Sequence, residues 1–550
     1  MYLLLPDLYL LYFHQNVKFF LMSVFILAYL FACLKSTKYL FLLLPFLILI
    51  PSYIYYISIY HVGINEQILS IVIETDIQEA IQFLGGQLYI YFIIYLFWLV
   101  LCLCCCHKHY KSPVIWCHWS RYLVIILGTV YFSLGYYLNA KIAAKMNSAF
   151  GDIENNFLVQ EENEFLQDLK QTYPLGLVIN TSNILKEQKK INQAFDKNNN
   201  FKFNSKRIEN SNKKEIYILV LGETSRRENW QLNGYERKTN PLLIQQENLI
   251  NFNNFISLSS ATRSSIPMML TRKPDSAVYK YEFPEKSIIS AFKETGFKTY
   301  WLSTQQKFGV FDTSTSVYAK EADHIEFLNK TGYQHTGVYD DILVSAVKKV
   351  VSEPVEKQFI VIHTLGSHYN YSHRYPRNFD YFKPSLNKVI QYSIQDKKYA
   401  QELRNSYDNS ILFTDYVLDG LIRVLDKQKD TMSFLLYSSD HGEDIFDGNC
   451  EKSGHGLETA RNFEIASFAW YSNAFAEKYE NKIRFIKQNK DRKMNHTAIF
   501  PTLLDAANIM IPNENLEKSI LKPFKDYERW VMGRYNFDHA EFVGECREIK

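Results

Sequence analysis

The sequence predicts a protein of two parts: a bundle of transmembrane helices in residues 1–140, followed by an α/β domain with a mainly parallel sheet covered by helices. The first 140 residues are dominated by long runs of Leu, Ile, Phe and Tyr, whereas the rest mixes charged and apolar residues. After residue 215, short apolar runs alternate with helical patterns. Two of these runs end in groups of potential metal ligands, as strands do in enzymes built on parallel sheets.

The overall composition excludes one class of function. The chain has 550 residues, of which 47% are hydrophobic, and a formal net charge of +3. Such a small positive charge, without a stripe of Lys and Arg interleaved with aromatic residues, does not indicate binding to nucleic acid. The length exceeds that of one ordinary domain, which agrees with a division into two parts.

Four apolar segments are long enough, or nearly so, to cross a bilayer, which takes about 20 helical residues. Residues 1–14 are apolar but short and contain Asp7, so they could form a further, partly inserted helix. Two of the connections between these segments carry Lys or Arg, whereas the connection between them, residues 61–87, carries neither. By the positive-inside rule the two basic connections are cytoplasmic, so everything after residue 140 lies outside the cytoplasm. The four segments are residues 19–34, 39–60, 88–106 and 122–140.

Residues 65–84, which this topology places outside, combine acidic and apolar side chains in a pattern typical of an amphipathic helix on the membrane surface. Thr75 and Glu79 are four residues apart and would share one side of that helix. A carboxylate there could receive the ammonium head of a phospholipid. A merely solvated helix face explains the same spacing equally well.

The cysteines are distributed as the topology predicts. Six of the eight lie in or beside the apolar segments, and the exported part holds only Cys450 and Cys546. Two cysteines in an oxidising compartment most often pair, so we expect a Cys450–Cys546 disulfide. Cys104–Cys106 with His107 and His109 could suggest a metal site. No second ligand pair follows at zinc-finger spacing, which favours ordinary membrane-interface residues or lipidation sites.

The two parts are joined by residues 141–214, which are predicted to form interfacial helices and then a polar linker rich in Asn and Lys. The catalytic domain is expected over residues 215–550, with strands and helices alternating around a parallel sheet. Apolar residues recur at helical spacing through residues 406–425. The strand candidates are residues 216–221, 298–302, 359–362 and 434–437.

Metal-binding side chains directly follow two of these strands: Glu223 after the first, and Asp440 and His441 after the last. They are ligands of the kinds that Zn²⁺ binds, and a catalytic zinc keeps one position for a nucleophile or substrate. Residues 259–267 form a hydroxyl-rich turn that could supply the nucleophile. A metal lowers the pKa of a bound hydroxyl and yields an alkoxide near neutral pH, and such a group attacks phosphorus.

Two histidines, His368 and His455, also fall near predicted strand ends. They are candidates to hold phosphate oxygens or a second metal, although a single histidine is more often structural than catalytic. The order of all these segments along the chain is much more specific than any one of them.

Eight short motifs follow one another along the chain: Gly222–Arg226, Leu232–Tyr235, Thr239–Pro241, Thr262–Pro267, His363–His368, Tyr407–Asn409, Ser439–Gly442 and Gly454–Gly456. This ordered set resembles the bacterial membrane-bound phosphoethanolamine transferases, over the catalytic domain and into the membrane half. The resemblance implies an alkaline phosphatase/sulfatase-like fold in the periplasm, anchored in the bacterial inner membrane. It also implies a zinc-bound threonine nucleophile, phosphatidylethanolamine as donor and a lipopolysaccharide glycolipid as acceptor.

The resemblance also implies roles for individual residues. Thr262, five residues before Pro267, matches the threonine nucleophile, and Glu223, Asp440 and His441 match the remaining zinc ligands. Five further residues match positions that bind substrate or, for the histidines, a second zinc: His368, His455, Lys307, Thr75 and Glu79.

The reaction that the resemblance implies has two steps. The Thr262 alkoxide attacks the donor phosphate, diacylglycerol leaves, and phosphoethanolamine stays on Thr262 until an acceptor hydroxyl or phosphate displaces it. The lipid A-modifying branch has several disulfides and a Cys-Gly-Thr turn, whereas this chain has Ser260–Thr262 and two exported cysteines. It therefore resembles more closely the branch that acts on heptose of the lipopolysaccharide core. A departure within the membrane half is Ile71, which stands where a polar head-group residue is expected.

Two rival hypotheses stay open. A glycerophosphate transferase of the lipoteichoic acid synthase kind shares the membrane-plus-sulfatase layout and the threonine nucleophile. A non-catalytic envelope-assembly scaffold would keep the fold, but the intact set of Glu, Thr, Asp and His residues argues against it. A true sulfatase is excluded, because Ser265-Ile-Pro267 is followed by Met268 and Met269 and not by the arginine that would hold a formylglycine nucleophile.

Overall fold

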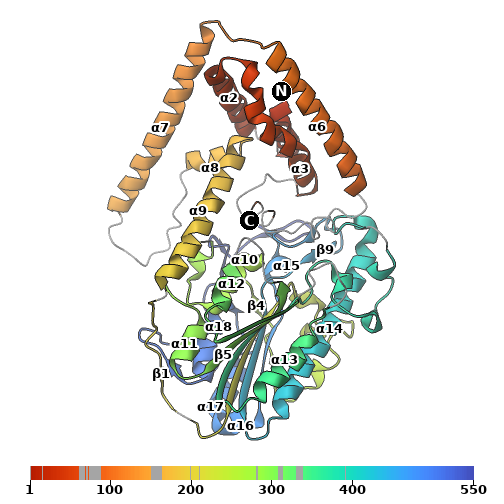
Figure 1. The fold of residues 1–550 in the computed structure, drawn as a ribbon. Coiled ribbons are helices and arrows are strands. Elements are labelled where there is room, and N and C mark those ends of the chain that lie inside the picture. The colour runs from red at the N-terminus through yellow and green to blue at the C-terminus, as the bar shows by residue number, and fades with distance from the viewer. Residues whose placement is uncertain are drawn as a thin grey trace. The chain divides into compact units, whose positions relative to one another are not determined.

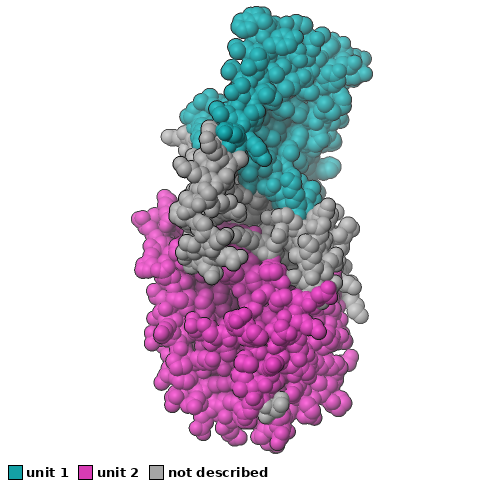
Figure 2. All heavy atoms as spheres, turned by 90° about the vertical axis from the view of Figure 1, so that its left-hand side faces the viewer, with its two compact units in different colours: residues 1–75, 84–188 teal, residues 76–83, 189–550 magenta. Residues whose placement is uncertain are grey.

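The computed structural model describes residues 2–14, 17–60, 69, 72, 88–149, 164–198, 200–209, 211–279, 283–306, 314–329, 338–389 and 392–550. The chain divides into two compact units, one formed by residues 1–75 and 84–188 and the other by residues 76–83 and 189–550 (Figure 2). Each unit has its own apolar core.

The first unit is helical. Its described helices are η1 (Tyr2–Leu4), α1 (Leu5–His14), α2 (Val17–Leu34), η2 (Thr37–Leu43), α3 (Leu44–Tyr60), α6 (Leu88–Lys111), α7 (Ser120–Ala149), α8 (Glu164–Lys170) and the start of α9 (Leu175–Asn198).

Three helical stretches among the described residues are long and apolar enough to cross a membrane: Val17–Leu34, Thr37–Ser58 and Leu88–Lys111. They coincide with the first three predicted spans. The fourth, residues 122–140, lies within α7 and stays a prediction, because the side chains of α7 after residue 137 are outside the described set. Tyr2–Tyr12 forms a shorter apolar helix, in the region expected to be partly inserted.

The turn between α8 and α9 docks into the core of the helical unit. Tyr173 is buried, its hydroxyl donates to the carbonyl of Phe46 at 2.5 Å, and its backbone N–H donates to Asp7 Oδ1 at 3.1 Å. Asp7 is itself buried, so this N–H gives a carboxylate inside an apolar helix bundle one of the partners that burial requires.

The second unit is built on a seven-stranded sheet, in the described residues, with the order β3-β11-β8-β2-β7-β5-β6. The central strands β8, β2, β7, β5 and β6 are parallel, and β11 runs antiparallel between β8 and β3. The bounds are β2 (Glu215–Gly222), β3 (Leu249–Asn251), β5 (Lys298–Gln306), β6 (His324–Asn329), β7 (Lys357–His363), β8 (Met432–Ser439) and β11 (Ser467–Tyr471). The predicted α/β fold with a mainly parallel sheet is confirmed, and the four predicted strands are β2, β5, β7 and β8.

Both faces of the sheet are covered by helices, which explains why β2 is an uninterrupted apolar run after Glu215. Helices α13 (Ile342–Val351) and α14 (Ala400–Asp426) pack on the face formed by Ile216, Ile218 and Val220. Helices α10 (Thr262–Leu270), α11 (Ile288–Glu294) and α18 (Ile499–Ala506) pack on the opposite face (Figure 1). The predicted helix over residues 406–425 is the main part of α14.

Short elements complete the unit around the sheet. Phe203, in the segment expected to be a linker, is buried in the core of this unit. Besides short 3-10 helices, the remaining described elements are β1 (Lys206–Arg207), β4 (Phe255–Ile256), α12 (Ser314–Ala319), β9 (Asp444–Ile445), β10 (Ser453–Gly454), α15 (Ala460–Phe463), α16 (Asn473–Lys478), α17 (Glu480–Asn489), β12 (Met494–Asn495), β13 (Ile509–Met510), β14 (Trp530–Val531), β15 (Tyr535–Asn536), β16 (Phe542–Val543) and β17 (Glu548–Ile549).

A disulfide joins Cys450 to Cys546, with a Cα–Cα distance of 4.7 Å, so the predicted pairing is confirmed. It fixes the C-terminal segment to the loop that connects β9 and β10. The same two segments are also joined by an ion pair between Lys452 and Glu548, at 2.6 Å.

Candidate active site

The register of the sheet places the predicted metal ligands at one edge. Strands β2 and β8 are parallel neighbours, and Gly222 lies opposite Ser439 at their carboxyl ends. Glu223 and Asp440 are the next residue on each strand, so both leave the sheet at the same level. This is the position where open α/β sheets bind their ligands.

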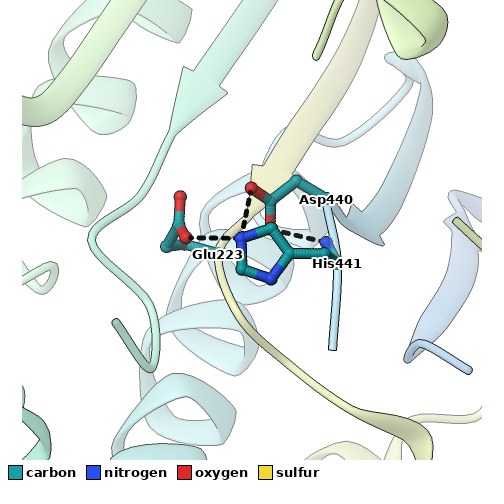
Figure 3. Close-up of side chains that lie close together, drawn as sticks. All are labelled: Glu223, Asp440 and His441. Carbon is teal, nitrogen blue, oxygen red and sulfur yellow. Dashed lines mark hydrogen bonds and ion pairs between the residues drawn. The ribbon is translucent and has the colours of Figure 1, made fainter. Parts of the chain in front are cut away.

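Glu223, Asp440 and His441 face one another in a fully buried cluster (Figure 3). His441 Nε2 lies 3.4 Å from Glu223 Oε1 and 3.5 Å from Asp440 Oδ2. One ligand atom from each residue lies within 4.8 Å of the other two, which is the convergence that a bound metal ion requires.

Thr262 also lies in this cluster, in contact with Glu223 and His441. It is the first residue of α10, and its Oγ1 lies 3.3 Å from both carboxylate oxygens of Glu223 and 3.3 Å from His441 Nε2. The positive end of a helix dipole favours negative charge nearby, so the start of α10 would stabilise an ionised Thr262 oxygen. The four residues predicted to hold zinc are thus brought together from three separate parts of the chain.

The protonation of His441 is coupled to the two carboxyl groups of the cluster. Burial, and then the charge of Glu223, raises the pKa of Asp440 to about 7. Burial alone would lower the pKa of His441, but Asp440 and Glu223 outweigh that effect and raise it to about 10. The His441 side chain in turn lowers the pKa of Glu223, against the effect of its burial. The single positive charge of an imidazolium offsets one of the two carboxylates, whereas a divalent cation would offset both and displace that proton, because a bound metal needs deprotonated ligands.

The hydrogen bonds of the ligands leave atoms available for a cation. Asp440 Oδ1 accepts from the backbone N–H groups of Thr224 and His441, at 3.0 and 2.7 Å. Its Oδ2 is buried and has no hydrogen-bond partner in the described part of the chain. His441 Nδ1 lies 2.9 Å from the carbonyl of Gly442, which directs Nε2 towards the cluster. A buried carboxylate oxygen that accepts no hydrogen bond, beside an imidazole held in one orientation, fits a zinc site.

The loop after β7 is packed against the backbone of Glu223. The N–H of Ser367 donates to the Glu223 carbonyl at 3.0 Å, and Asp340 accepts the N–H groups of Leu365 and Gly366. Gly366 has a φ of 51°, and a Cβ at this position would lie 2.6 Å from the Glu223 carbonyl oxygen. Only glycine allows this close approach, which accounts for the glycine in the His363–His368 motif.

The two predicted histidines lie beside the ligand cluster. The ring centroid of His455 is 4.6 Å from that of His441 and 5.6 Å from that of His368. His455 Nδ1 lies 3.4 Å from Glu443 Oε1, and His368 Nδ1 lies 2.6 Å from the carbonyl of Tyr369.

Two buried residues of the site were not predicted from the sequence. Glu443 follows the Asp-His-Gly motif, is fully buried and lies 3.4 Å from His455 Nδ1. Gln305 comes from the carboxyl end of β5, and its amide donates to the Thr364 carbonyl at 2.8 Å and approaches Glu223 Oε2 at 3.5 Å. Position was the one signal that could have identified them: Glu443 follows β8, and Gln305 lies near the carboxyl end of β5.

Three predicted substrate-binding residues, Lys307, Thr75 and Glu79, lie outside the described residues. The same is true of nearly all of the expected amphipathic helix over residues 65–84, and of Ile71.

Comparison with known families decides the classification. Residues 215–509, more than half of the chain, match the sulfatase family model. The chain belongs to the sulfatase family. Residues 19–147 match a second family, described as phosphoethanolamine transferase EptA/EptB, so the membrane half is shared with these transferases as well.

Individual relatives are also named phosphoethanolamine transferases. The chain is 28% identical to phosphoethanolamine transferase EptC of Escherichia coli K12 over 344 residues, which cover 60% of this chain and 57% of EptC. It is 28% identical to phosphoethanolamine transferase CptA of Salmonella typhimurium over 330 residues, covering 58% of this chain and 55% of CptA. The chain thus spans less than two thirds of the length of these relatives.

Solved structures show the same architecture. The C-terminal periplasmic domain of E. coli EptC in complex with Zn matches with a TM-score of 0.56 and 26% identity, covering 63% of this chain and 98% of that domain. The lipooligosaccharide phosphoethanolamine transferase A of Neisseria meningitidis matches with a TM-score of 0.67, covering 92% of both chains at 19% identity, and shows the fold of membrane helices plus sulfatase-like domain. The resemblance inferred from the motifs is confirmed.

Proposed function

We propose that this protein transfers phosphoethanolamine from phosphatidylethanolamine to lipopolysaccharide, with core heptose favoured over lipid A. The observation that carries the proposal is the position of Thr262 Oγ1, which lies 3.3 Å from Glu223 and from His441 in a sulfatase-family site. A hydroxyl placed among metal ligands is the arrangement by which an enzyme activates an alcohol as a nucleophile. The match of residues 19–147 to the EptA/EptB model supports phosphoethanolamine transfer over the glycerophosphate rival.

Zinc is the proposed cofactor, held by Glu223, Asp440, His441 and Thr262. Its chemistry would be to lower the pKa of the Thr262 hydroxyl and to offset charge on the phosphate oxygens. Two carboxylates, one imidazole and one hydroxyl are suitable zinc ligands, and Asp440 Oδ2, which accepts no hydrogen bond in the described part of the chain, would be free to bond the ion. The periplasmic domain of E. coli EptC, which has this fold, was crystallised in complex with Zn, and this supports the choice of metal.

The proposed reaction has two steps, and both take place on Thr262. Thr262 Oγ1 loses its proton and attacks the phosphorus of the donor, an O–P bond forms, and the O–P bond to diacylglycerol breaks as the diacylglycerol oxygen takes up a proton. Phosphoethanolamine is then carried on Thr262 until an acceptor oxygen attacks the same phosphorus, loses its proton and frees Thr262. His368, His455 and Lys307 would contact the phosphate oxygens, while Thr75 and Glu79 would hold the ethanolamine ammonium group.

We infer that the transfer takes place in the periplasm, with residues 1–140 in the inner membrane, residues 141–214 as interfacial helices and linker, and residues 215–550 as the catalytic domain. The Cys450–Cys546 disulfide supports an oxidising compartment. Three described helices of membrane-spanning length support the anchoring.

The test compares lipopolysaccharide from cells that express the wild-type chain, Thr262→Ala or no copy of the protein. The wild type is expected to add one phosphoethanolamine unit to a core sugar, detected by mass spectrometry, and Thr262→Ala none. Thr271→Ala, at the other end of α10, is the matched control and is expected to keep the transfer. Unmodified lipopolysaccharide with the wild-type chain contradicts the proposal, and modification confined to lipid A contradicts its core preference.

A further inference from the structure

The residue that follows Glu223 has a strained backbone. Thr224 has a φ of 57°, in the left-handed region that a β-branched residue rarely adopts. Such a conformation persists only where the surroundings hold it. This conformation of Thr224 matters to the site, because the residue donates its N–H to Asp440 Oδ1 at 3.0 Å and its hydroxyl to Glu223 Oε1 at 2.8 Å. The turn at Thr224 thus links the two carboxylates of the site.

The hydroxyl of Tyr407 bridges this turn. It donates to the carbonyl of Thr224 at 2.6 Å and accepts the N–H of Arg226 at 2.9 Å. Tyr407 belongs to α14 and lies in the core, where its ring packs edge-to-face against Tyr371 with centroids 5.2 Å apart. One buried hydroxyl therefore satisfies two backbone groups on both sides of residue 225.

The two residues after Tyr407 hold other loops in the same way. Asp408 Oδ2 accepts from the Tyr235 hydroxyl at 2.9 Å and from Arg237 Nη1 at 2.8 Å. Asn409 Oδ1 accepts the backbone N–H groups of residues 381 and 382, at 3.0 and 2.8 Å. The Tyr407–Asn409 motif is therefore a buried polar segment of α14 that fixes three loops, and the loop held by Tyr407 begins at Glu223.

We propose that Tyr407 is a positioning residue of the metal site, whose hydroxyl holds Thr224 in the left-handed conformation and so directs Glu223 towards Thr262 and His441. The inference rests on the proposed function, since it assumes that Glu223 is a zinc ligand. Without the hydroxyl, the carbonyl of Thr224 and the N–H of Arg226 lose a buried partner. The turn then rearranges towards ordinary backbone angles, and the Glu223 carboxylate moves away from the other ligands.

The test is the zinc affinity of the full-length, detergent-solubilised chain, measured by competition with a chelator. Tyr407→Phe removes only the bridging hydroxyl and is expected to weaken zinc binding about 10- to 100-fold, as loss of partners that orient a ligand does. Tyr217→Phe is the matched control, because Tyr217 is a buried tyrosine at the opposite end of β2 whose hydroxyl donates to Glu215 at 2.9 Å. It is expected to keep the wild-type affinity within about twofold, since its hydroxyl touches no ligand of the site.

The outcomes separate the inference from the proposed function. A wild-type chain that binds no zinc refutes the proposed zinc site, and the inference fails with it. If the wild-type chain binds zinc and the Tyr407→Phe variant binds it with the same affinity, the inference alone is refuted. A similar loss of affinity in both tyrosine variants also refutes it, because the effect would then be general destabilisation.

If Tyr407→Phe does not fold, the same substitution is combined with Thr224→Gly or with Thr224→Ala. Glycine adopts a φ near 57° without strain, whereas alanine does not. The pair with glycine is expected to fold and to bind zinc about fivefold or more tightly than the pair with alanine. Equal behaviour of the two pairs, folded or unfolded, refutes the inference.

Discussion

The two halves of the candidate site are held in different ways. Glu223, Asp440 and His441 leave the ends of β2 and β8 directly and are completely buried. His455 lies instead in the segment between β10 and α15, and 22% of its side chain is exposed. The loop before it is held by the Cys450–Cys546 disulfide and by ion pairs. The sheet thus fixes the three proposed metal ligands, whereas a cross-linked loop leads to His455, which would meet the substrate.

The largest loss of transfer is expected when a metal ligand at the end of the sheet, Glu223, is replaced. Glu223→Gln keeps the shape of the side chain but removes the negative charge that a zinc ion needs. Transfer should fall on the order of a thousandfold or more, and the purified chain should lose its zinc. Metal content measured by mass spectrometry, together with transfer of phosphoethanolamine to lipopolysaccharide, checks this. A variant that keeps both stoichiometric zinc and transfer shows that Glu223 is not a ligand.

The histidine of the loop half should show a smaller and different effect. His455→Ala removes one proposed contact to the phosphate oxygens and should lower transfer by about a hundredfold. Zinc held by Glu223, Asp440 and His441 should remain bound. The comparison of metal content with transfer rate checks the separation, and loss of zinc in this variant would move His455 into the ligand group.

Removal of the disulfide should loosen the segment around Cys450 far more than the sheet. The pair Cys450→Ala and Cys546→Ala opens a loop closed across 96 residues and should reduce the free energy of unfolding by about 2–5 kcal/mol. Amide hydrogen exchange should rise in residues 444–456 and stay slow in β2 and β8. Uniform acceleration over the whole sheet domain contradicts the division into two halves.

The smallest expected effect is on acid stability, through Asp447 in the same loop. Asp447 pairs with Arg226 at 2.6 Å and with Arg404 at 3.0 Å. Burial would raise its pKa, but the Arg226 guanidinium outweighs this and holds the pKa of Asp447 below its usual value. Because the folded pKa is the lower one, this stabilisation is present above about pH 4 and is lost as the pH falls further.

Thermal unfolding between about pH 2 and pH 6 checks this dependence. Wild-type stability should fall steeply below about pH 4, whereas Asp447→Asn should be less stable at pH 6 and show a weaker decline. Equal slopes for the two proteins would show that Asp447 has no part in the acid transition.

The sequence predicted those features that depend on local patterns. Runs such as Ile216–Leu221 are apolar throughout because both faces of the sheet are covered, so β2, β5, β7 and β8 could be recognised. Parallel strands end at one edge, which made the meeting of Glu223 with Asp440 predictable. The strands β3, β6 and β11 were missed, because short runs near a sheet edge carry little periodicity.

Contacts between distant loops could not be predicted in the same way. The hydroxyl of Tyr407 meets Thr224 across 183 residues, and Gln305 approaches Glu223 across 82. Glu443 stands in a polar run between His441 and Asp444, and nothing in that run indicates its approach to His455. Periodicity reports which face of an element is buried, but which loops meet is decided by the packing of the whole domain.

The most direct test of the central claim is a search for the covalent intermediate on Thr262. The purified chain is incubated with phosphatidylethanolamine without acceptor, digested and examined by tandem mass spectrometry. We expect one phosphoethanolamine group on the peptide that contains Thr262, absent from Thr262→Ala and lost when lipopolysaccharide is added. A phosphoethanolamine group on another residue, or transfer to lipopolysaccharide by Thr262→Ala, would contradict the account.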